Sequence, residues 1–159
     1  MSRRSLSLFA LLSLMTLSPC VRADDWPQWM GPKRDGIWSE TGIVRQLPVG
    51  ELKPLWKKPI TGGYSGPAVA DGRVYVFDYK LEKGTPMNSP GGRPELSGQE
   101  RLHCLDAKTG NQIWEHSYPC KYEISYPAGP RATPTISGGK VYTVGSEEIC
   151  SASTPRPEK

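Results

Sequence analysis

An internal repeat in the second half of the chain places the strongest constraint on the fold. Residues 67–78 (PAVADGRVYVFD) align without a gap on residues 134–145 (PTISGGKVYTVG), 67 positions later. A shorter stretch at residues 55–60 (LWKKPI) recurs at residues 113–118 (IWEHSY), 58 positions later. Two elements that recur in the same order, at nearly the same separation, indicate a repeat architecture.

The repeated unit has the pattern of a four-stranded antiparallel sheet. An Asp-Gly pair at residues 71–72 lies between two β-rich runs and predicts a tight hairpin, because glycine tolerates the positive φ of such turns. A third strand over residues 102–105 ends at Asp106, and a fourth follows over residues 112–115. Four strands per unit is the number in a propeller blade. We therefore predict an all-β fold, a partial β-propeller with about two blades.

The connection between the third and fourth strands, CLDAKTGNQIW, is interpreted as a structural motif. The Asp106 carboxylate can accept backbone N–H groups two or three residues on, as in an Asx-turn, and Thr109 adds a hydroxyl donor. Gly110 supplies the left-handed conformation that reverses the chain. Trp114 is a ring that buries about 200 Å² between packed sheets. The alternatives are a general base at Asp106 and cofactor stacking by Trp114.

Three further segments carry predictions about local structure. Residues 24–36 (DDWPQWMGPKRDG) are expected to form an extended segment that places Trp26 and Trp29 on a core. Residues 55–60 are expected to form a short strand. Residues 80–99 are rich in Pro and Gly and are predicted to be a surface loop.

The N-terminus has the pattern of a secretory signal peptide. An Arg pair at residues 3–4 precedes an apolar run over residues 6–18, and residues 21–23 suit cleavage after Ala23. We expect a periplasmic or secreted protein without a transmembrane helix after cleavage. The alternatives are an uncleaved membrane anchor and a lipoprotein, because residues 17–20 (LSPC) resemble a lipobox.

Charge and metal-ligand patterns exclude several classes of partner. Removal of residues 1–23 takes away three Arg and no acidic residue, so the formal charge falls from +4 to +1. No clustered basic patch remains, so no nucleic-acid partner is expected. His103 and His116 have no second ligand at metal-site spacing, and no catalytic or metal-binding set is predicted.

Three cysteines remain after cleavage, and their pairing stays open. Export permits a disulfide, and Cys104 with Cys120 is one possibility. The alternative is that Cys104, in an apolar strand pattern, is a buried thiol. The odd count leaves at least one free thiol, such as Cys150.

The connecting motif resembles the Trp-docking repeat of quinoprotein-like β-propellers, whose pattern is A-x-D-x-x-T-G-x-x-x-W. Asp106, Thr109, Gly110 and Trp114 match it, and Cys104 replaces the usual Ala. Residues 24–36 resemble the N-terminal segment of secreted bacterial PQQ-like repeat proteins of the polyvinyl-alcohol-dehydrogenase-like group. The resemblance covers residues 24–145 and implies that Trp114 packs against a neighbouring blade.

The chain is shorter than a closed propeller of this kind. The mature 136 residues hold about two blades, and residues 146–159 (SEEICSASTPRPEK) lack another docking motif. We expect an N-terminal part of a longer propeller with a divergent, disordered tail at residues 146–159, so that the remaining blades are needed for closure. A self-sufficient small β domain is the alternative.

The function expected from these features is a binding or scaffold module for a protein or small-molecule ligand. Tyr64, Tyr126 and Arg131 lie in loops near the hairpins and are the candidate ligand-face residues. The resemblance also implies two alternatives. One is a quinoprotein-type alcohol dehydrogenase, which would bind pyrroloquinoline quinone with calcium, although no vicinal Cys pair occurs. The other is an envelope-assembly propeller lipoprotein.

Overall fold

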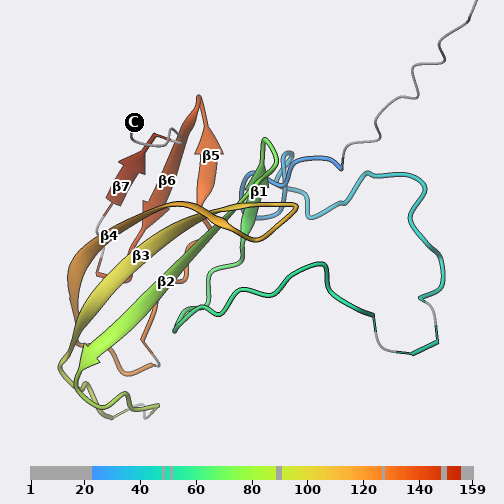
Figure 1. Cartoon of the computed structure of the whole chain (residues 1–159). Helices are drawn as coiled ribbons and strands as arrows, with labels where there is room; N and C mark the ends of the chain where they lie inside the picture. The colour runs from blue at the N-terminus through green and yellow to red at the C-terminus, as the bar shows by residue number, and fades with distance from the viewer. Residues whose placement is uncertain are drawn as a thin grey trace, which may run out of the picture.

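The fold consists of two antiparallel sheets, as the repeat predicts (Figure 1). The computed structural model describes residues 23–47, 49–50, 52–88, 91–126, 128–147 and 150–154. The signal peptide expected over residues 1–23 lies outside these residues, except for Ala23. Within the described ranges every regular element is a strand, and no helix suited to crossing a membrane is found. The all-β prediction is confirmed.

The first sheet has four strands in sequence order: β1 (Ala68–Ala70), β2 (Arg73–Lys83), β3 (Leu96–Asp106) and β4 (Gln112–Tyr122). The second sheet has three: β5 (Thr135–Ser137), β6 (Lys140–Val144) and β7 (Cys150–Ser153). Figure 1 shows the second sheet standing beside the first, with β5 next to β1.

The register of the two hairpins reproduces the sequence repeat. In the first hairpin Ala68 pairs with Tyr75, and 67 positions later Thr135 pairs with Tyr142. Each two-residue turn has positive φ at both positions, 53° and 71° in the first and 55° and 70° in the second. This is the signature of a type I′ turn, whose twist matches that of the flanking strands. The predicted hairpins are confirmed in both repeats.

The core lies between the two sheets. One cluster joins the first sheet to β6 through Val141, and it includes Tyr75, Phe77, Leu102 and Cys104. A second cluster lies further along β2, β3 and β4, where Tyr79 stacks on Tyr122 with ring centres 4.2 Å apart. Aromatic side chains bury the most apolar area per residue, so these stacked rings contribute strongly to the packing on this part of the first sheet.

The prediction of a strand over residues 55–60 is wrong. These residues form no strand, and Leu55 is 92% exposed. Figure 1 shows the described part of residues 40–54 in a wide arc away from both sheets, after which the chain returns towards the first sheet. A strand needs a neighbour for its backbone hydrogen bonds, and among the described residues no strand pairs with this segment.

The loop predicted over residues 80–99 is shorter than expected. β2 continues to Lys83 and β3 begins at Leu96, so only residues 84–95 connect them. Gly98 explains part of the extension: a Cβ there would overlap the Lys80 carbonyl oxygen and touch the Tyr79 ring. The glycine that indicated a loop in the sequence is instead required for close packing within the sheet.

The N-terminal segment contacts the sheet through only one of its two predicted tryptophans. Trp26 pairs with Val69 through two backbone hydrogen bonds of 2.8 and 2.9 Å and is half-buried. Trp29 is 69% exposed, so its prediction is wrong. A tight turn follows Gln28, with Met30 at φ 62°, and directs the Trp29 side chain outward.

The three cysteines of the described residues form no disulfide. Cys104 and Cys120 are both free and buried. Cys104 lies opposite Trp114, whereas Cys120 lies opposite Gly98, six residues away along β3. At about 3.3 Å per residue the two positions are roughly 20 Å apart, too far for a bond.

The tail expected to be disordered from residue 146 contains a strand. Residues 150–153 form β7, which pairs with β6 from Val144–Cys150 to Val141–Ser153. This pairing supplies partners for the backbone N–H and C=O groups at the edge of β6. The polar composition of the tail did not indicate such a strand. The end of the tail, residues 155–159, lies outside the described residues.

Candidate functional site

Four connecting segments gather at one end of the strands, which we call the loop end. They are the segment before β1 and the β2–β3, β4–β5 and β6–β7 connections. The opposite end, the turn end, carries the β1–β2, β3–β4 and β5–β6 turns. In an antiparallel sheet successive connections lie at opposite ends, so every second connection lies at the same end. Side chains from different repeats therefore meet at the loop end.

All three candidate ligand-face residues meet at the loop end. Tyr64, Tyr126 and Arg131, together with Asn88, line a cavity of about 280 Å³. The guanidinium carbon of Arg131 lies 5.4 Å from the centre of each tyrosine ring. Such cation–π contacts contribute about 0.5–1 kcal/mol at exposed sites. We call these four residues the Arg131 cluster.

Backbone contacts hold the two sides of the Arg131 cluster together. The carbonyl oxygen of Pro130 accepts hydrogen bonds from Tyr64 N (2.8 Å) and Ser65 N (3.1 Å). Gly129, at φ 131°, packs so closely that a Cβ would lie 2.5 Å from the Cα of Gly63. The backbone alone therefore joins the segments that carry Tyr64 and Arg131.

Extension of the sequence repeat explains why these two segments meet. The offset of 67 residues places Tyr64 in register with Arg131 and Gly62 with Gly129. Equivalent positions of neighbouring repeats lie at the same level on adjacent sheets. The repeat itself thus brings the tyrosine of one unit to the arginine of the next.

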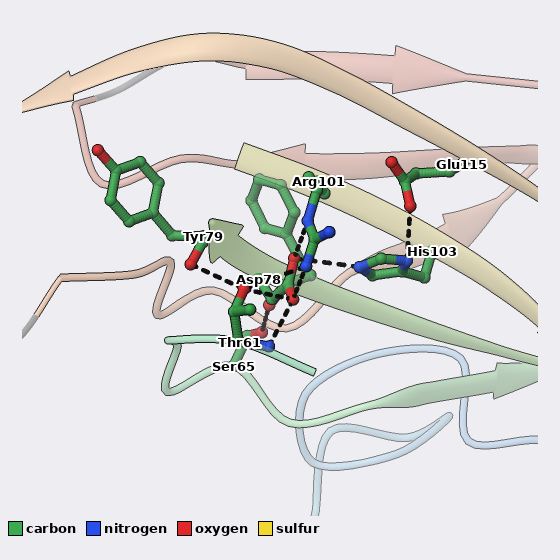
Figure 2. A network of polar contacts seen from close by, with 8 residues as sticks. Thr61, Ser65, Asp78, Tyr79, Arg101, His103 and Glu115 are labelled. Atoms are coloured by element: carbon green, nitrogen blue, oxygen red, sulfur yellow. Dashed lines mark hydrogen bonds and ion pairs between the residues drawn. The ribbon is translucent and has the colours of Figure 1, made fainter. Parts of the chain in front are cut away.

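A buried polar network fixes the segment that leads to Tyr64 (Figure 2). The Asp78 carboxylate is fully buried and accepts hydrogen bonds from the N–H and hydroxyl of Thr61, at 2.8 and 2.7 Å. Arg101 donates to both oxygens of the same carboxylate, from Nε at 3.0 Å and from Nη2 at 2.7 Å. The hydroxyl of Ser65 donates to the Phe77 carbonyl oxygen at 2.7 Å. The strands of the first sheet thereby anchor the loop on both sides of Tyr64.

His103 completes this network on the side of β4. Its Nε2 lies 3.1 Å from Asp78 Oδ1, and its Nδ1 lies 3.1 Å from Glu115 Oε2 (Figure 2). The second contact has the distance of an ion pair but not the alignment of a hydrogen bond. Burial alone would raise the pKa of Asp78, but hydrogen bonds from His103, Arg101 and Thr61 outweigh it and hold the pKa well below its ordinary value.

A second buried carboxylate connects the two sheets. Glu100 accepts hydrogen bonds from the hydroxyls of Tyr118, at 2.5 Å, and Tyr122, and from the backbone N–H of Ser146, at 3.0 Å. Burial and these bonds to Glu100 raise the pKa of both tyrosines, so they remain protonated donors. The Ser146 hydroxyl donates to the Gly129 carbonyl oxygen at 2.8 Å and so extends the link to the Arg131 cluster.

The docking motif lies at the turn end of the first sheet. One oxygen of Asp106 accepts three hydrogen bonds: from Lys108 N, Thr109 N and the Thr109 hydroxyl, at 3.1, 2.8 and 2.9 Å. The bonds to Thr109 lower the pKa of Asp106. Gly110 has φ 70°. Trp114 is half-buried against the first core cluster, 6.1 Å from the Tyr75 ring.

A tryptophan outside the docking motif packs on this turn. Trp56 Nε1 donates to the Ala107 carbonyl oxygen at 2.9 Å. The Trp56 ring lies so close to Gly110 that a Cβ there would come within 2.6 Å of it. Trp56 and Trp114 are equivalent in the 58-residue repeat, so the sequence already contained the signal for this contact.

Comparison with known families decides the relationship of the chain. The family model described as "Outer membrane protein assembly factor BamB", a model of PQQ-like repeats, matches residues 40–155. The chain belongs to this PQQ-like repeat family. No curated protein and no solved structure matched the chain.

Membership in the PQQ-like repeat family accounts for the two sheets. A four-stranded sheet followed by a second antiparallel sheet, related by a constant offset, is a partial β-propeller of such repeats. Trp56 shows how one repeat of this family contacts the next: a ring from the preceding segment packs on the β3–β4 turn.

Sequence reasoning named Tyr64, Tyr126 and Arg131 but missed the residues that support them. Asn88, Asp78 and Glu100 were not singled out. An acidic residue within an apolar alternation is the signal that marks Asp78, whose neighbours Phe77 and Tyr79 are buried. Glu100 lies in a more polar stretch, so only the structure identifies its role.

A second cavity of about 360 Å³ lies under the N-terminal segment, lined in part by Trp26, Ile37 and Trp38. Its carboxylate Asp25 already accepts the backbone N–H of Asp71 at 3.2 Å, which closes the first hairpin turn. In the described part of the chain no three His, Cys, Asp or Glu side chains gather as a metal site would require. The Arg131 cluster is therefore the stronger candidate site.

Proposed function

We propose that this chain is an exported propeller-repeat module that binds a partner through its loop end. The observation that supports this most directly is the Arg131 cluster, in which an exposed guanidinium and two exposed tyrosines from neighbouring repeats surround one cavity. Tyrosine and arginine are enriched among the residues that dominate binding energy at protein interfaces.

The site is better suited to recognition than to catalysis. A candidate nucleophile or general base needs a partner group that activates it. The buried carboxylates Asp78 and Glu100 instead accept several hydrogen bonds each, from groups that hold the loops. We assign these residues a supporting role and assign binding to the exposed cluster.

Two features support a role in the bacterial envelope. The Arg pair and apolar run at residues 3–18 have the pattern of an export signal. Residues 24–36 resemble the secreted polyvinyl-alcohol-dehydrogenase-like group, and the family description names an outer-membrane assembly factor. A scaffold in the periplasm or outside the cell fits both. Fusion of alkaline phosphatase after Lys159 tests export, because that enzyme is active only outside the cytoplasm.

The proposal includes further blades as partners of the first sheet. Leu55 and Ile60 flank the segment that docks through Trp56, and both are exposed. Large exposed apolar side chains in one stretch are typical of a surface covered in the complete assembly. Additional repeats would cover them.

A site-specific photo-crosslinking experiment tests the binding face. Asn88, in the Arg131 cluster, and Asn111, in the β3–β4 turn, are exposed residues of the same type at opposite ends of the first sheet. A photoreactive residue at position 88 is expected to form a defined adduct in the envelope, identified by mass spectrometry, and the same residue at position 111 is not. Equal adducts at both positions, or none at position 88, would contradict the proposal.

A further inference from the structure

We infer that the Arg131 cluster recognises the carboxylate of an acidic side chain, Asp or Glu, on a protein partner. This inference rests on the proposed function and adds the chemistry of the ligand. Three observations support it: the unused donors of Arg131, the charges around it, and the size of the cavity.

The first observation concerns hydrogen-bond donors. A guanidinium has five N–H donors. In the described residues Arg131 uses only Nη1, which makes two long contacts of 3.4 Å to the Gly129 carbonyl oxygen and the Ser146 hydroxyl. Nε and Nη2 donate to no described residue. These two groups form the edge that binds a carboxylate with two parallel hydrogen bonds.

The second observation concerns charge. Three acidic side chains at the loop end contact other groups: Glu82 accepts from Gln99, Glu95 lies 3.8 Å from Lys121, and Glu147 accepts the backbone N–H of Glu123. No described carboxylate lies within ion-pair distance of Arg131. The positive charge of Arg131 is therefore left for an external anion, whereas Arg101 nearby is paired with Asp78.

The third observation concerns shape. The cavity of about 280 Å³ lies close to the lower limit of about 300 Å³ that is usual for small-molecule sites, and it is open to solvent. It has room for an acidic side chain. The two tyrosine rings and the Asn88 amide offer apolar contact and further hydrogen bonds to the stem and head of such a side chain. Because the site is open at the surface, a residue presented by a protein partner can reach it.

Titration with a pair of short peptides tests the inference. The whole chain is titrated by calorimetry with a capped peptide of Gly and Glu and with its counterpart of Gly and Gln. We expect the Glu peptide alone to bind. Arg131→Gln is expected to weaken binding about tenfold or more, as the loss of a charge-assisted pair predicts. Arg131→Lys, which keeps the charge but not the paired donors, is expected to weaken it less.

Lys121→Gln is the matched control, because it removes the same charge from the same end of the sheet outside the cluster. The affinity of the Lys121→Gln variant for the Glu peptide is expected to stay within about twofold of that of the unaltered chain, since exposed charges contribute little. Equal losses for Arg131→Gln and Lys121→Gln would reduce the effect to general charge and overturn the inference. If free glutarate binds more tightly than the Glu peptide, the site prefers a free dicarboxylate, and the inference of a protein partner is overturned.

The outcome separates this inference from the proposed function. If the Glu and Gln peptides bind alike or not at all while the adduct at position 88 forms, the loop end binds a partner through other chemistry and the inference alone fails. If the adduct also fails, both fail. Urea unfolding of each variant verifies that the exposed substitutions leave the fold intact.

Discussion

Tyr64 and Arg131 occupy the same position in consecutive repeats, 67 residues apart, and their side chains meet with the guanidinium carbon 5.4 Å from the ring centre. A backbone hydrogen bond connects the same two segments: Tyr64 N donates to the carbonyl oxygen of Pro130, the residue before Arg131. The candidate site is thus a property of two adjacent repeats. Substitutions that loosen the contact between the repeats should affect it.

The contact between Trp56 and Gly110 predicts a large cost for Gly110→Ala. The new methyl group would overlap the Trp56 ring, and the residue would remain at φ 70°. We expect the free energy of unfolding in urea to fall by about 2–4 kcal/mol. Gly139→Ala is the control, because Gly139 has the same φ of 70° but nothing within 4 Å of the added atom, so only about 1 kcal/mol is expected. Equal losses would contradict the packing of Trp56 on the turn.

The depressed pKa of Asp78 predicts a stability loss in acid. The unfolded carboxyl has a pKa of about 3.9, above the folded value, so the unfolded state binds more protons between the two. The contribution is complete above about pH 5 and is lost as the pH falls through the unfolded pKa towards the folded pKa. Asp78→Asn should flatten this part of the curve of unfolding free energy against pH, and should lower stability at pH 7 by about 2–4 kcal/mol.

Asp106→Asn provides the comparison for an exposed carboxylate. Its pKa is also lowered, by the bonds to Thr109, but the group is open to solvent. Salt at about 0.5 M should therefore reduce the effect of Asp106→Asn and leave that of Asp78→Asn nearly unchanged. A loss at Asp78 that disappears in salt would contradict its burial in the network.

The hydrogen bonds that Glu100 accepts predict that Glu100→Gln weakens the link between the two sheets. The amide group would direct its NH₂ towards donors, so at least one of Tyr118, Tyr122 and Ser146 would lose an acceptor. We expect a loss of about 2–4 kcal/mol and faster hydrogen exchange in β6 than in β2. Glu115→Gln makes the same change at a partly exposed side chain and should cost less than about 1 kcal/mol. Equal exchange in both strands would count against a link through Glu100.

The burial of two cysteines predicts selective labelling. Burial raises the pKa of Cys104 to about 11 and, with Glu100 nearby, that of Cys120 to about 12. Since the thiolate is the reactive form, neither should react with a maleimide at pH 8. Cys150 is exposed in β7 and should react within minutes. Peptide mass spectrometry assigns the label to each cysteine, and rapid labelling of Cys104 in the native protein would show that the first core cluster is open.

Local features were predictable from the sequence because their contacts are close along the chain. The type I′ turns need only two residues with positive φ, and the hydrogen bonds of Asp106 reach no further than Thr109. The 67-residue repeat also predicted the matching register of the two hairpins. Alternating apolar residues and tight turns together determined the all-β class.

The length of β2 and β3 could not be derived in the same way. Pro and Gly between residues 80 and 99 indicated a loop, yet Gly98 lies within β3, where the Tyr79 ring occupies the space that a side chain would fill. The prediction of a strand over residues 55–60 failed for the converse reason, because no strand in the described part of the chain pairs with this segment. Strand pairing depends on the partner as well as on the segment.

By itself the sequence therefore determined the repeat, its turns and the residue types available at the candidate site. Only the tertiary structure decided that Tyr64, Tyr126 and Arg131 surround one cavity, that Asp78 holds the loop before Tyr64, and that Glu100 joins the two sheets. Apart from the contact of Arg131 with Tyr126, these contacts connect residues 17 to 67 positions apart. No local propensity encodes them, because they form only when the packing of one sheet on the other excludes water and leaves each buried polar group to find its partner.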